Sequence, residues 1–198
     1  MSGIYVDEHG KYQIDLTKTI WSTDKLHDIY TATIGNELSD VDWIGETENE
    51  IFLVECKDPT FVEDDTMCRC NGCDCDACKS ETNICTKCGK PATRKAVKKD
   101  YYAEFLDKCC KKYYGSTFYL LSNEKKKPIM YYCIVNDTPL ADRAWRARAA
   151  ASIKKRLPYL LQDGTHTTMQ LIKDCGVVTV DEWNELYTAF PVIALPRQ

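Results

Sequence analysis

Three side chains in one apolar segment have the types and the spacing of a metal-dependent hydrolytic site. The segment, residues 39–58, reads SDVDWIGETENEIFLVECKD. In a strand, residues i and i+2 share a face, so Glu55 and Lys57 project together, and Asp42 on a neighbouring strand can lie beside Glu55. Two carboxylates and a lysine make an oxygen-rich site for a hard divalent cation such as magnesium. Such a cation polarises a phosphodiester and lowers the pKa of a bound water, which Lys57 would orient.

Two antiparallel strands must position these groups. Residues 40–45 and 51–57 are β-like and flank the polar turn ETENE, and Pro59 ends the second strand because proline cannot donate to the ladder. Upstream, a β-hairpin is predicted from the pattern of residues 4–8 and 11–16. Ser22 or Thr23 is the predicted N-cap of a helix that ends near Ala32.

The rest of the chain supplies covering helices and further strands. Residues 100–114 predict an amphipathic helix that Gly115 ends, and 117–121 and 129–135 predict two strands. Residues 141–157 predict a helix whose buried stripe is Trp145, Ala149, Ile153 and Leu157. The tail holds two short helix candidates, the second opened by the capping box at 179–182. The order of elements predicts a mixed α/β fold.

This arrangement resembles the PD-(D/E)xK nuclease superfamily, which has the restriction-endonuclease-like fold. Val41-Asp42 takes the place of Pro-Asp, and Glu55-Cys56-Lys57 matches Glu-x-Lys. The resemblance covers about residues 22–160 and implies a mixed central sheet flanked by helices. It implies that Asp42, Glu55 and the backbone carbonyl of Cys56 hold Mg²⁺ or Mn²⁺. Many members add an acidic residue from the first helix, for which Asp24 and Asp28 are both candidates; other members are inactive binding proteins.

A cysteine-rich module follows the second strand. Seven of the 12 cysteines lie in a short window, and Cys-x-x-Cys occurs three times within it. Two such pairs complete a tetrahedral zinc site. Cys85 and Cys88 form one half of a zinc knuckle. Two cysteine pairs fit as the other half, namely 70/73 and 75/78. The candidate zinc ligands are Cys68, Cys70, Cys73, Cys75, Cys78, Cys85 and Cys88.

Seven thiolates exceed the needs of one zinc ion. Either two zincs share ligands, or the surplus thiols are redox-active. The composition between Met67 and Pro91 is too polar to bury a core, so metal would supply the folding free energy. An iron–sulfur cluster and a disulfide knot or free thiols are the alternatives. Cys109, Cys110 and Cys133 occupy core-like positions outside the module and are predicted to be packed thiols.

Charge is distributed unevenly along the chain. Residues 1–66 hold 16 Asp and Glu against 4 Lys and Arg, whereas residues 87–156 hold 18 Lys and Arg against 6 Asp and Glu. The overall net charge of −4 is therefore a cancellation. The basic segment is typical of a surface that tracks phosphates, so a nucleic-acid partner is predicted, with DNA favoured over RNA. The residues predicted to contact nucleic acid are Lys95, Lys98, Lys99, Lys126, Lys127, Arg143 and Arg146.

Other classes are excluded or left without support. No apolar run reaches the roughly 20 residues that cross a bilayer, and the N-terminus has no secretory h-region, so a cytoplasmic location is predicted. His27 on the first helix is the one histidine that could approach the site, although a structural role is the simpler reading. No cysteine outside the module has an evident histidine partner, so a Cys–His hydrolase is not supported.

The sequence predicts an α/β nuclease core with an inserted zinc-knuckle module. The core would comprise residues 1–66 and 92–165, the module residues 67–91, and a C-terminal helical extension residues 166–198. The predicted activity is metal-dependent hydrolysis of phosphodiesters by an endo- or exonuclease, with Mg²⁺ or Mn²⁺ at the catalytic site and one or two structural Zn²⁺. The alternative is a catalytically inactive, zinc-stabilised adaptor that binds nucleic acid or protein. A protein partner or a homodimer is compatible with either.

Overall fold

The structure, a computed structural model, describes residues 3–35, 37–57, 66–70, 92–96, 101–136, 141–163 and 169–196, with the backbone alone for 66–70 and 92–96. The chain divides into two compact units. One comprises Met1–Pro59 and Ala103–Gln198, and the other comprises Thr60–Tyr102. Each is described by itself.

The larger unit is built on a five-stranded mixed sheet. The strand order is β3 (Trp21–Thr23), β4 (Trp43–Glu46), β5 (Ile51–Cys56), β8 (Ile129–Ile134) and β9 (Ile172–Val178). Strands β3, β4 and β5 pair antiparallel, whereas β5, β8 and β9 pair parallel. The parallel connections contain the helices α2 (Tyr101–Ser122) and α3 (Arg143–Arg156), as parallel pairing requires. The predicted α/β class is confirmed.

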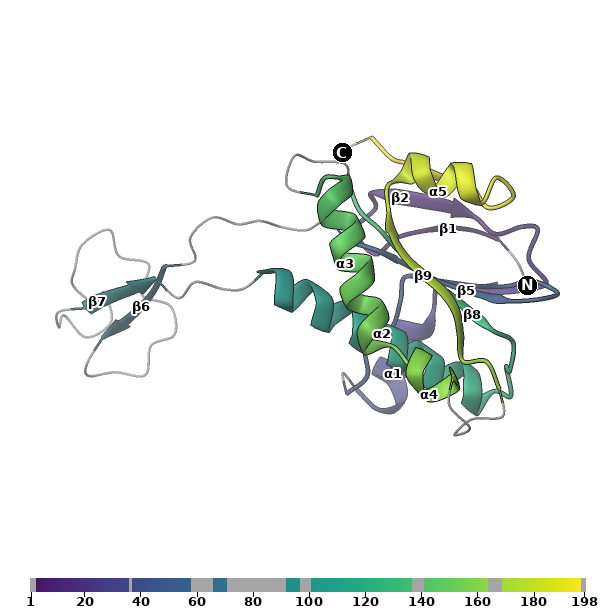
Figure 1. Ribbon diagram of the computed structural model, residues 1–198, viewed down its shortest axis with the longest axis horizontal. Coiled ribbons are helices and arrows are strands. Elements are labelled where there is room, and N and C mark those ends of the chain that lie inside the picture. Colours follow the sequence, from purple (N-terminus) through teal and green to yellow (C-terminus); the bar gives the residue numbers. More distant parts are fainter. Residues whose placement is uncertain are drawn as a thin grey trace. The chain divides into compact units, whose positions relative to one another are not determined.

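Helices cover one face of this sheet and a small second sheet covers the other (Figure 1). Beside α2 and α3, the helical side holds α1 (Leu26–Thr33) and α4 (Tyr159–Asp163). The opposite side holds α5 (Val180–Leu186) and a three-stranded antiparallel sheet of β1 (Ile4–Val6), β2 (Tyr12–Asp15) and β10 (Val192–Ala194). The predicted N-terminal hairpin is β1–β2.

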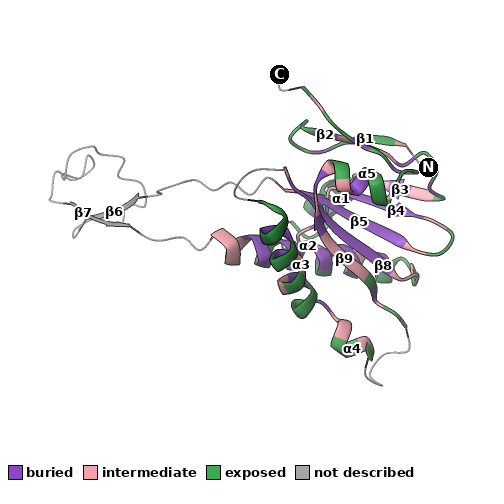
Figure 2. Ribbon diagram, turned by 45° about the horizontal axis from the view of Figure 1, so that its top comes forward, coloured by how far each residue is buried: buried purple, intermediate pink, exposed green. Residues whose placement is uncertain are grey.

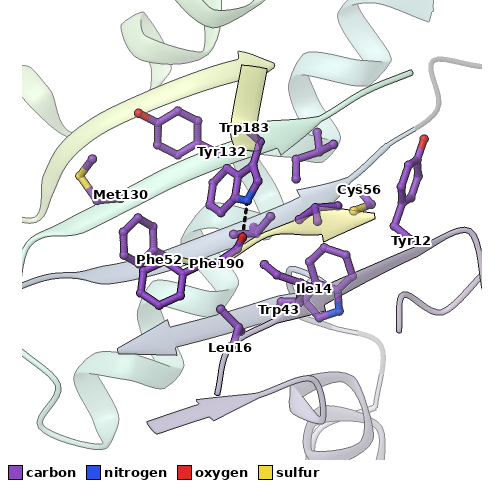
Figure 3. Close-up of a cluster of buried hydrophobic side chains, with 13 residues drawn as sticks. Tyr12, Ile14, Leu16, Trp43, Phe52, Cys56, Met130, Tyr132, Trp183 and Phe190 are labelled. Carbon is purple, nitrogen blue, oxygen red and sulfur yellow. Dashed lines mark hydrogen bonds between the residues drawn. The ribbon is translucent and has the colours of Figure 1, made fainter. Parts of the chain in front are cut away.

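Strands β5 and β8 are buried along their whole length (Figure 2). Their side chains alternate between two cores, because successive residues point to opposite faces. Phe52, Val54 and Cys56 belong to a cluster with Trp183 and other residues of α5, β2 and β10, drawn in Figure 3. The indole Nε1 of Trp183 donates to the Phe190 carbonyl at 2.7 Å, which closes this core. Glu55 therefore faces the helical side.

The strand predicted over 117–121 is wrong, because these residues belong to α2. Gly115 does not end that helix. A Cβ atom at Gly115 would lie 1.9 Å from the Ser39 carbonyl oxygen, so this glycine permits close contact between α2 and the segment before β4. The β-prone residues that follow are held helical by packing, which overrides local propensity.

The predicted start of the first helix also differs from the structure. Residues 21–23 form β3, and α1 begins after Lys25 without a side-chain cap, although Thr23 Oγ1 accepts a hydrogen bond from the Lys25 amide at 3.1 Å.

The helical stripe predicted over 141–157 is confirmed, since Trp145, Ala149, Ile153 and Leu157 are all buried.

The segment predicted as a C-terminal helical extension contributes two strands and one helix. The capping box that opens α5 is confirmed, with Thr179 as N-cap and Glu182 as its reciprocal partner. Strand β9, in contrast, completes the central sheet. Its sequence hides this role because Gly176 interrupts the apolar pattern. A Cβ there would lie 2.6 Å from the Tyr132 ring, so the glycine is needed for packing.

The smaller unit contains a two-stranded antiparallel ribbon of β6 (Thr66–Cys70) and β7 (Ala92–Ala96). Cys70 pairs with Ala92 at the inner end of the ribbon, so the ribbon brackets residues 71–91. Most of the candidate zinc ligands fall within that bracketed segment.

Candidate active site

Asp42 and Glu55 meet at the ends of the two antiparallel strands β4 and β5. Trp43 pairs with Val54, so the residue before Trp43 and the residue after Val54 continue the register side by side. The Cys56 amide donates to Asp42 Oδ2 at 2.6 Å, which fixes the Asp42 carboxylate across the end of β5. The two predicted carboxylates are therefore brought together.

The Cys56 carbonyl is directed to the same place. The Cys56 N–H points to the β4 side, whereas the next amide, Lys57 N–H, donates to Ile134 of β8 at 2.8 Å. In a strand the N–H and C=O of one residue point to the same neighbour. The Cys56 carbonyl therefore faces the Asp42 side, and the three oxygen donors predicted as metal ligands share one edge.

Helix α2 holds the Asp42 segment in position. The Val41 amide donates to Ser116 Oγ at 3.0 Å, and the Tyr30 hydroxyl donates to the Gly115 carbonyl at 2.5 Å. Together with the close approach of Gly115 to Ser39, these contacts fix the backbone that carries Asp42. The sheet and α2 thus position the site jointly.

Lys112 of α2 is the cation that contacts the carboxylates, and sequence reasoning did not assign it this role. Its Nζ lies 2.8 Å from Glu55 Oε2, and its side chain is 19% exposed against 1% for Glu55. A readable signal existed: Phe105, Cys109 and Ser116 are buried at helical spacing on the same helix, and Lys112 falls within that stripe. A lysine in a buried stripe indicates a buried anion opposite.

Burial and mutual repulsion raise the pKa values of the carboxyl groups. The pKa of Glu55 is raised well above its usual range, first by burial and then by the charge of Asp42, and Lys112 opposes this shift. Burial also raises the pKa of Asp42, against the effects of Lys112 and the Cys56 amide. Burial lowers the pKa of Lys112, but the charges of Glu55 and Asp42 outweigh it and the pKa is raised. Lys112 is therefore an ammonium ion beside these two carboxyl groups.

A pocket of about 580 Å³ opens beside Asp42 and Lys112. Both acidic residues expected from the first helical region, Asp24 and Asp28, line this pocket, as does His27. Asp40, which is buried, also lines it and has its Oδ1 3.4 Å from His27 Nδ1. The remaining residues of its wall are Val6, Glu8, Leu38, Ser39 and Val41.

Lys57 follows β5 directly, and its side chain is half-buried. It is not among the residues that line the pocket, and among the described residues it is Lys112, not Lys57, that makes the ion pair with Glu55. The thiol of Cys56 points into the opposite core, where burial raises its pKa, so Cys56 contributes only backbone groups to the site.

The basic residues predicted to contact nucleic acid fall into several groups. Lys126 and Arg143 are exposed. Lys127 instead lies 2.8 Å from the buried carboxylate of Glu46, and the Arg146 guanidinium is buried and donates to Glu182 at 2.7 Å. Arg146 is thus a structural residue, contrary to the expectation. Lys98 and Lys99 lie outside the described residues, and Lys95 is described in its backbone alone.

The candidate zinc ligands lie almost entirely outside the described residues. Only the backbones of Cys68 and Cys70 are described, in β6, and the other five cysteines are not. Cys109, Cys110 and Cys133 are buried free thiols in the main unit, as predicted. Within the described part of the chain, no group of three or more His, Cys, Asp or Glu side chains is arranged to hold a metal ion.

Comparison with known proteins adds no family assignment: no protein-family model, curated protein or solved structure matches this chain. None of the described helices is both long and apolar enough to cross a bilayer.

Proposed function

We propose that this protein is a divalent-metal-dependent nuclease with a restriction-endonuclease-like core, and that DNA is its substrate. The observation that carries the proposal is the convergence of Asp42, Glu55 and the Cys56 carbonyl at one edge of β4 and β5. The order of elements supports it: a helix, an antiparallel strand pair and a helix that leads into a parallel strand, with Glu55 facing that second helix.

The donor set fits Mg²⁺ or Mn²⁺. All three donors are hard oxygens, and Mg²⁺ is commonly bound by one or two carboxylates, with waters and substrate phosphate completing its shell. A site of two carboxylates and a carbonyl therefore suits magnesium better than a cation that needs an all-protein cage. The burial of Glu55 also suits this role, because a carboxylate so fully removed from water requires a cation beside it.

The chain's own residues then have separate tasks. Asp42 and Glu55 hold the charge that attracts the cation, and the Cys56 amide keeps Asp42 in orientation. The cation, when bound, supplies Lewis-acid polarisation of the phosphodiester and a water of lowered pKa. We assign Lys57, just beyond β5, to the attacking water or the scissile phosphate. The exposed cations Arg143, Arg148, Lys154 and Lys155 of α3 are available to phosphates of the substrate backbone.

The test is cleavage of supercoiled plasmid and of single-stranded DNA with Mg²⁺ or Mn²⁺. We expect cleavage by the wild-type protein and a loss of about 100-fold or more in Glu55→Gln and Asp42→Asn, because each removes a charged ligand of the metal. Glu48→Gln is the matched control, since Glu48 is exposed in the turn between the same two strands, and it should retain full activity.

Two outcomes would contradict the proposal. Cleavage that survives unchanged in both Glu55→Gln and Asp42→Asn would remove these residues from the mechanism. Binding of DNA without any cleavage, together with no Mn²⁺ bound at Asp42 and Glu55, would favour the inactive zinc-stabilised adaptor instead.

A further inference from the structure

The ammonium group of Lys112 lies between the pocket and the buried carboxylate. Its Nζ is 2.8 Å from Glu55 Oε2, and the same side chain lines the pocket together with Asp42. Glu55 itself does not line the pocket, and its side chain is 1% exposed. A cation that enters through the pocket therefore meets Lys112 before it meets Glu55.

An ammonium ion and a divalent metal ion compete for the same carboxylates. Both are attracted by the carboxyl oxygens of Asp42 and Glu55, and they repel each other when they are a few ångströms apart in a poorly screened interior. A magnesium ion binds its oxygen ligands at about 2.0–2.1 Å. Glu55, one of the residues that would hold it, is already in contact with Lys112.

We propose that Lys112 is the resident counter-ion of the site and a positioning residue for metal binding. In the metal-free protein its ammonium group contacts Glu55 and occupies the place beside the two carboxyl groups. When the divalent ion binds, Lys112 releases Glu55 and moves into the pocket. The inference rests on the proposed function in one respect, namely that Asp42 and Glu55 bind a divalent cation.

The pocket offers the displaced ammonium another partner. Asp40 lines the same wall, is buried, and is paired with His27 at 3.4 Å. Burial raises the pKa of Asp40 and the nearby charge of Lys112 opposes that shift, so the ammonium is already within electrostatic reach of Asp40. A change of rotamer would then exchange one buried carboxylate for another, without exposing an unpaired charge in the interior.

The first experiment uses the wild-type chain and follows lysine ammonium groups by NMR in ¹⁵N-lysine-labelled protein. Without metal we expect a protected ammonium signal that is absent in Lys112→Arg and is therefore assigned to Lys112. Saturating Mg²⁺ should shift this signal or remove it through fast exchange with solvent. A Lys112 signal unchanged at saturating Mg²⁺ would overturn the inference.

The second experiment measures Mn²⁺ binding by electron paramagnetic resonance at pH 8.0. Lys112→Met keeps much of the apolar stem but removes the competing charge, so we expect Mn²⁺ to bind about tenfold more tightly than in the wild-type protein. Lys111→Met is the matched control, because Lys111 is exposed on the same helix, and its affinity should equal that of the wild type. Equal or weaker binding in Lys112→Met would count against the inference.

Lys112→Met leaves Glu55 unpaired, so its folding is checked by circular dichroism. If the variant melts early without metal, Mn²⁺ should raise its melting temperature by more than it raises that of the wild type. An equal or smaller rise would contradict the counter-ion role. Lys112→Met/Glu55→Gln, which removes both charges, should melt near the wild type but bind Mn²⁺ weakly.

The outcomes also separate this inference from the proposed function. Mn²⁺ that binds the wild-type protein with an affinity unchanged by Lys112→Met would reject the counter-ion role and leave the nuclease proposal standing. No Mn²⁺ bound by either protein would reject both.

Discussion

Glu46 of β4 is a second buried carboxylate of the central sheet, and two lysines balance its charge. Lys125 and Lys127, from the loop before β8, both pair with it. Burial raises the pKa of Glu46, but hydrogen bonds from the two lysines outweigh burial and lower it. The stabilisation from this cluster is therefore present above the ordinary glutamate pKa of about 4.3 and is lost as the pH falls through the lower folded-state value.

Glu46→Gln should lower the free energy of unfolding by about 1–3 kcal/mol at pH 7, because it removes a charged acceptor from two lysines. The difference from the wild type should shrink as the pH falls below about 4, where the wild-type carboxylate becomes protonated. Urea unfolding at pH 7.0 and pH 3.0 measures this. Glu48→Gln, at an exposed position, should have the same free energy of unfolding as the wild type at both pH values. If Glu46→Gln were destabilised equally at both pH values, the pairing of a charged Glu46 with the two lysines would be contradicted.

At the scale of single residues, the sequence was informative where the geometry is local. Strand alternation and the short turn between the strands suffice to place Asp42 beside Glu55. The partner of Glu55, Lys112, comes instead from α2, which follows the cysteine-rich module in the sequence. Which residue of α2 faces Glu55 depends on how the helix is rotated about its axis. The spacing of Phe105, Cys109 and Ser116 indicates this rotation, but a motif search overlooks it.

At the scale of elements, Gly115 determines how closely α2 approaches the segment that carries Asp42. Gly115→Ala places a methyl carbon 1.9 Å from the Ser39 carbonyl oxygen, so either α2 or the segment that carries Asp42 must shift. We expect a loss of about 1–3 kcal/mol in the free energy of unfolding, although alanine has the higher helix propensity. DNA cleavage should fall as well, because the shift misplaces Asp42.

Phe118→Ala on the same helix provides the comparison for Gly115→Ala, because its side chain is 60% exposed. Its free energy of unfolding should change by about 0.5 kcal/mol or less. Thermal or urea unfolding of Gly115→Ala and Phe118→Ala measures the two changes in the free energy of unfolding. A Gly115→Ala protein as stable and as active as the wild type would show that the close approach has no structural importance.

Elements were predictable where local pattern and tertiary role agree. The strands around Asp42 and Glu55 and the helix at 141–157 carry clean periodicity and were found. The C-terminal half of α2 and strand β9 were not. In both, a glycine that looks like a break is required by close packing, against Ser39 in one and against Tyr132 in the other. Such a requirement is set by a distant segment and leaves no local signature.

At the scale of the whole molecule, the two compact units should respond differently to loss of metal. We predict that one or two zinc ions bind the cysteine-rich module, and that a strong chelator unfolds the unit Thr60–Tyr102. The larger unit has its own core and should retain its main melting transition. Zinc analysis of the purified full chain and hydrogen exchange with and without chelator test this. Exchange rates in 66–96 that do not change on chelation would argue against structural zinc.

The charge asymmetry of the sequence overstates what a nucleic acid would meet. Several of the cations counted in the basic segment are used inside the larger unit: Lys112 with Glu55, Lys127 with Glu46, and Arg146 with Glu182. Composition along the chain cannot separate an internal ion pair from an exposed patch, because the pairing anions lie in distant segments of the sequence. Among the residues whose side chains the structure describes, the exposed cations that remain lie mostly on α3.

The β6–β7 ribbon has a consequence for the speed of folding. Parallel pairing of β5 with β8 requires the chain to close a long loop that contains the cysteine-rich module. Once Thr66 pairs with Ala96, the ribbon bypasses the residues between them, and the loop between β5 and β8 becomes roughly 1.7-fold shorter. The free-energy cost of loop closure then falls by about 0.5 kcal/mol, which corresponds to a refolding rate about twofold higher. A module built around metal would thus act as a folding accelerator for a sheet to which it contributes no strand.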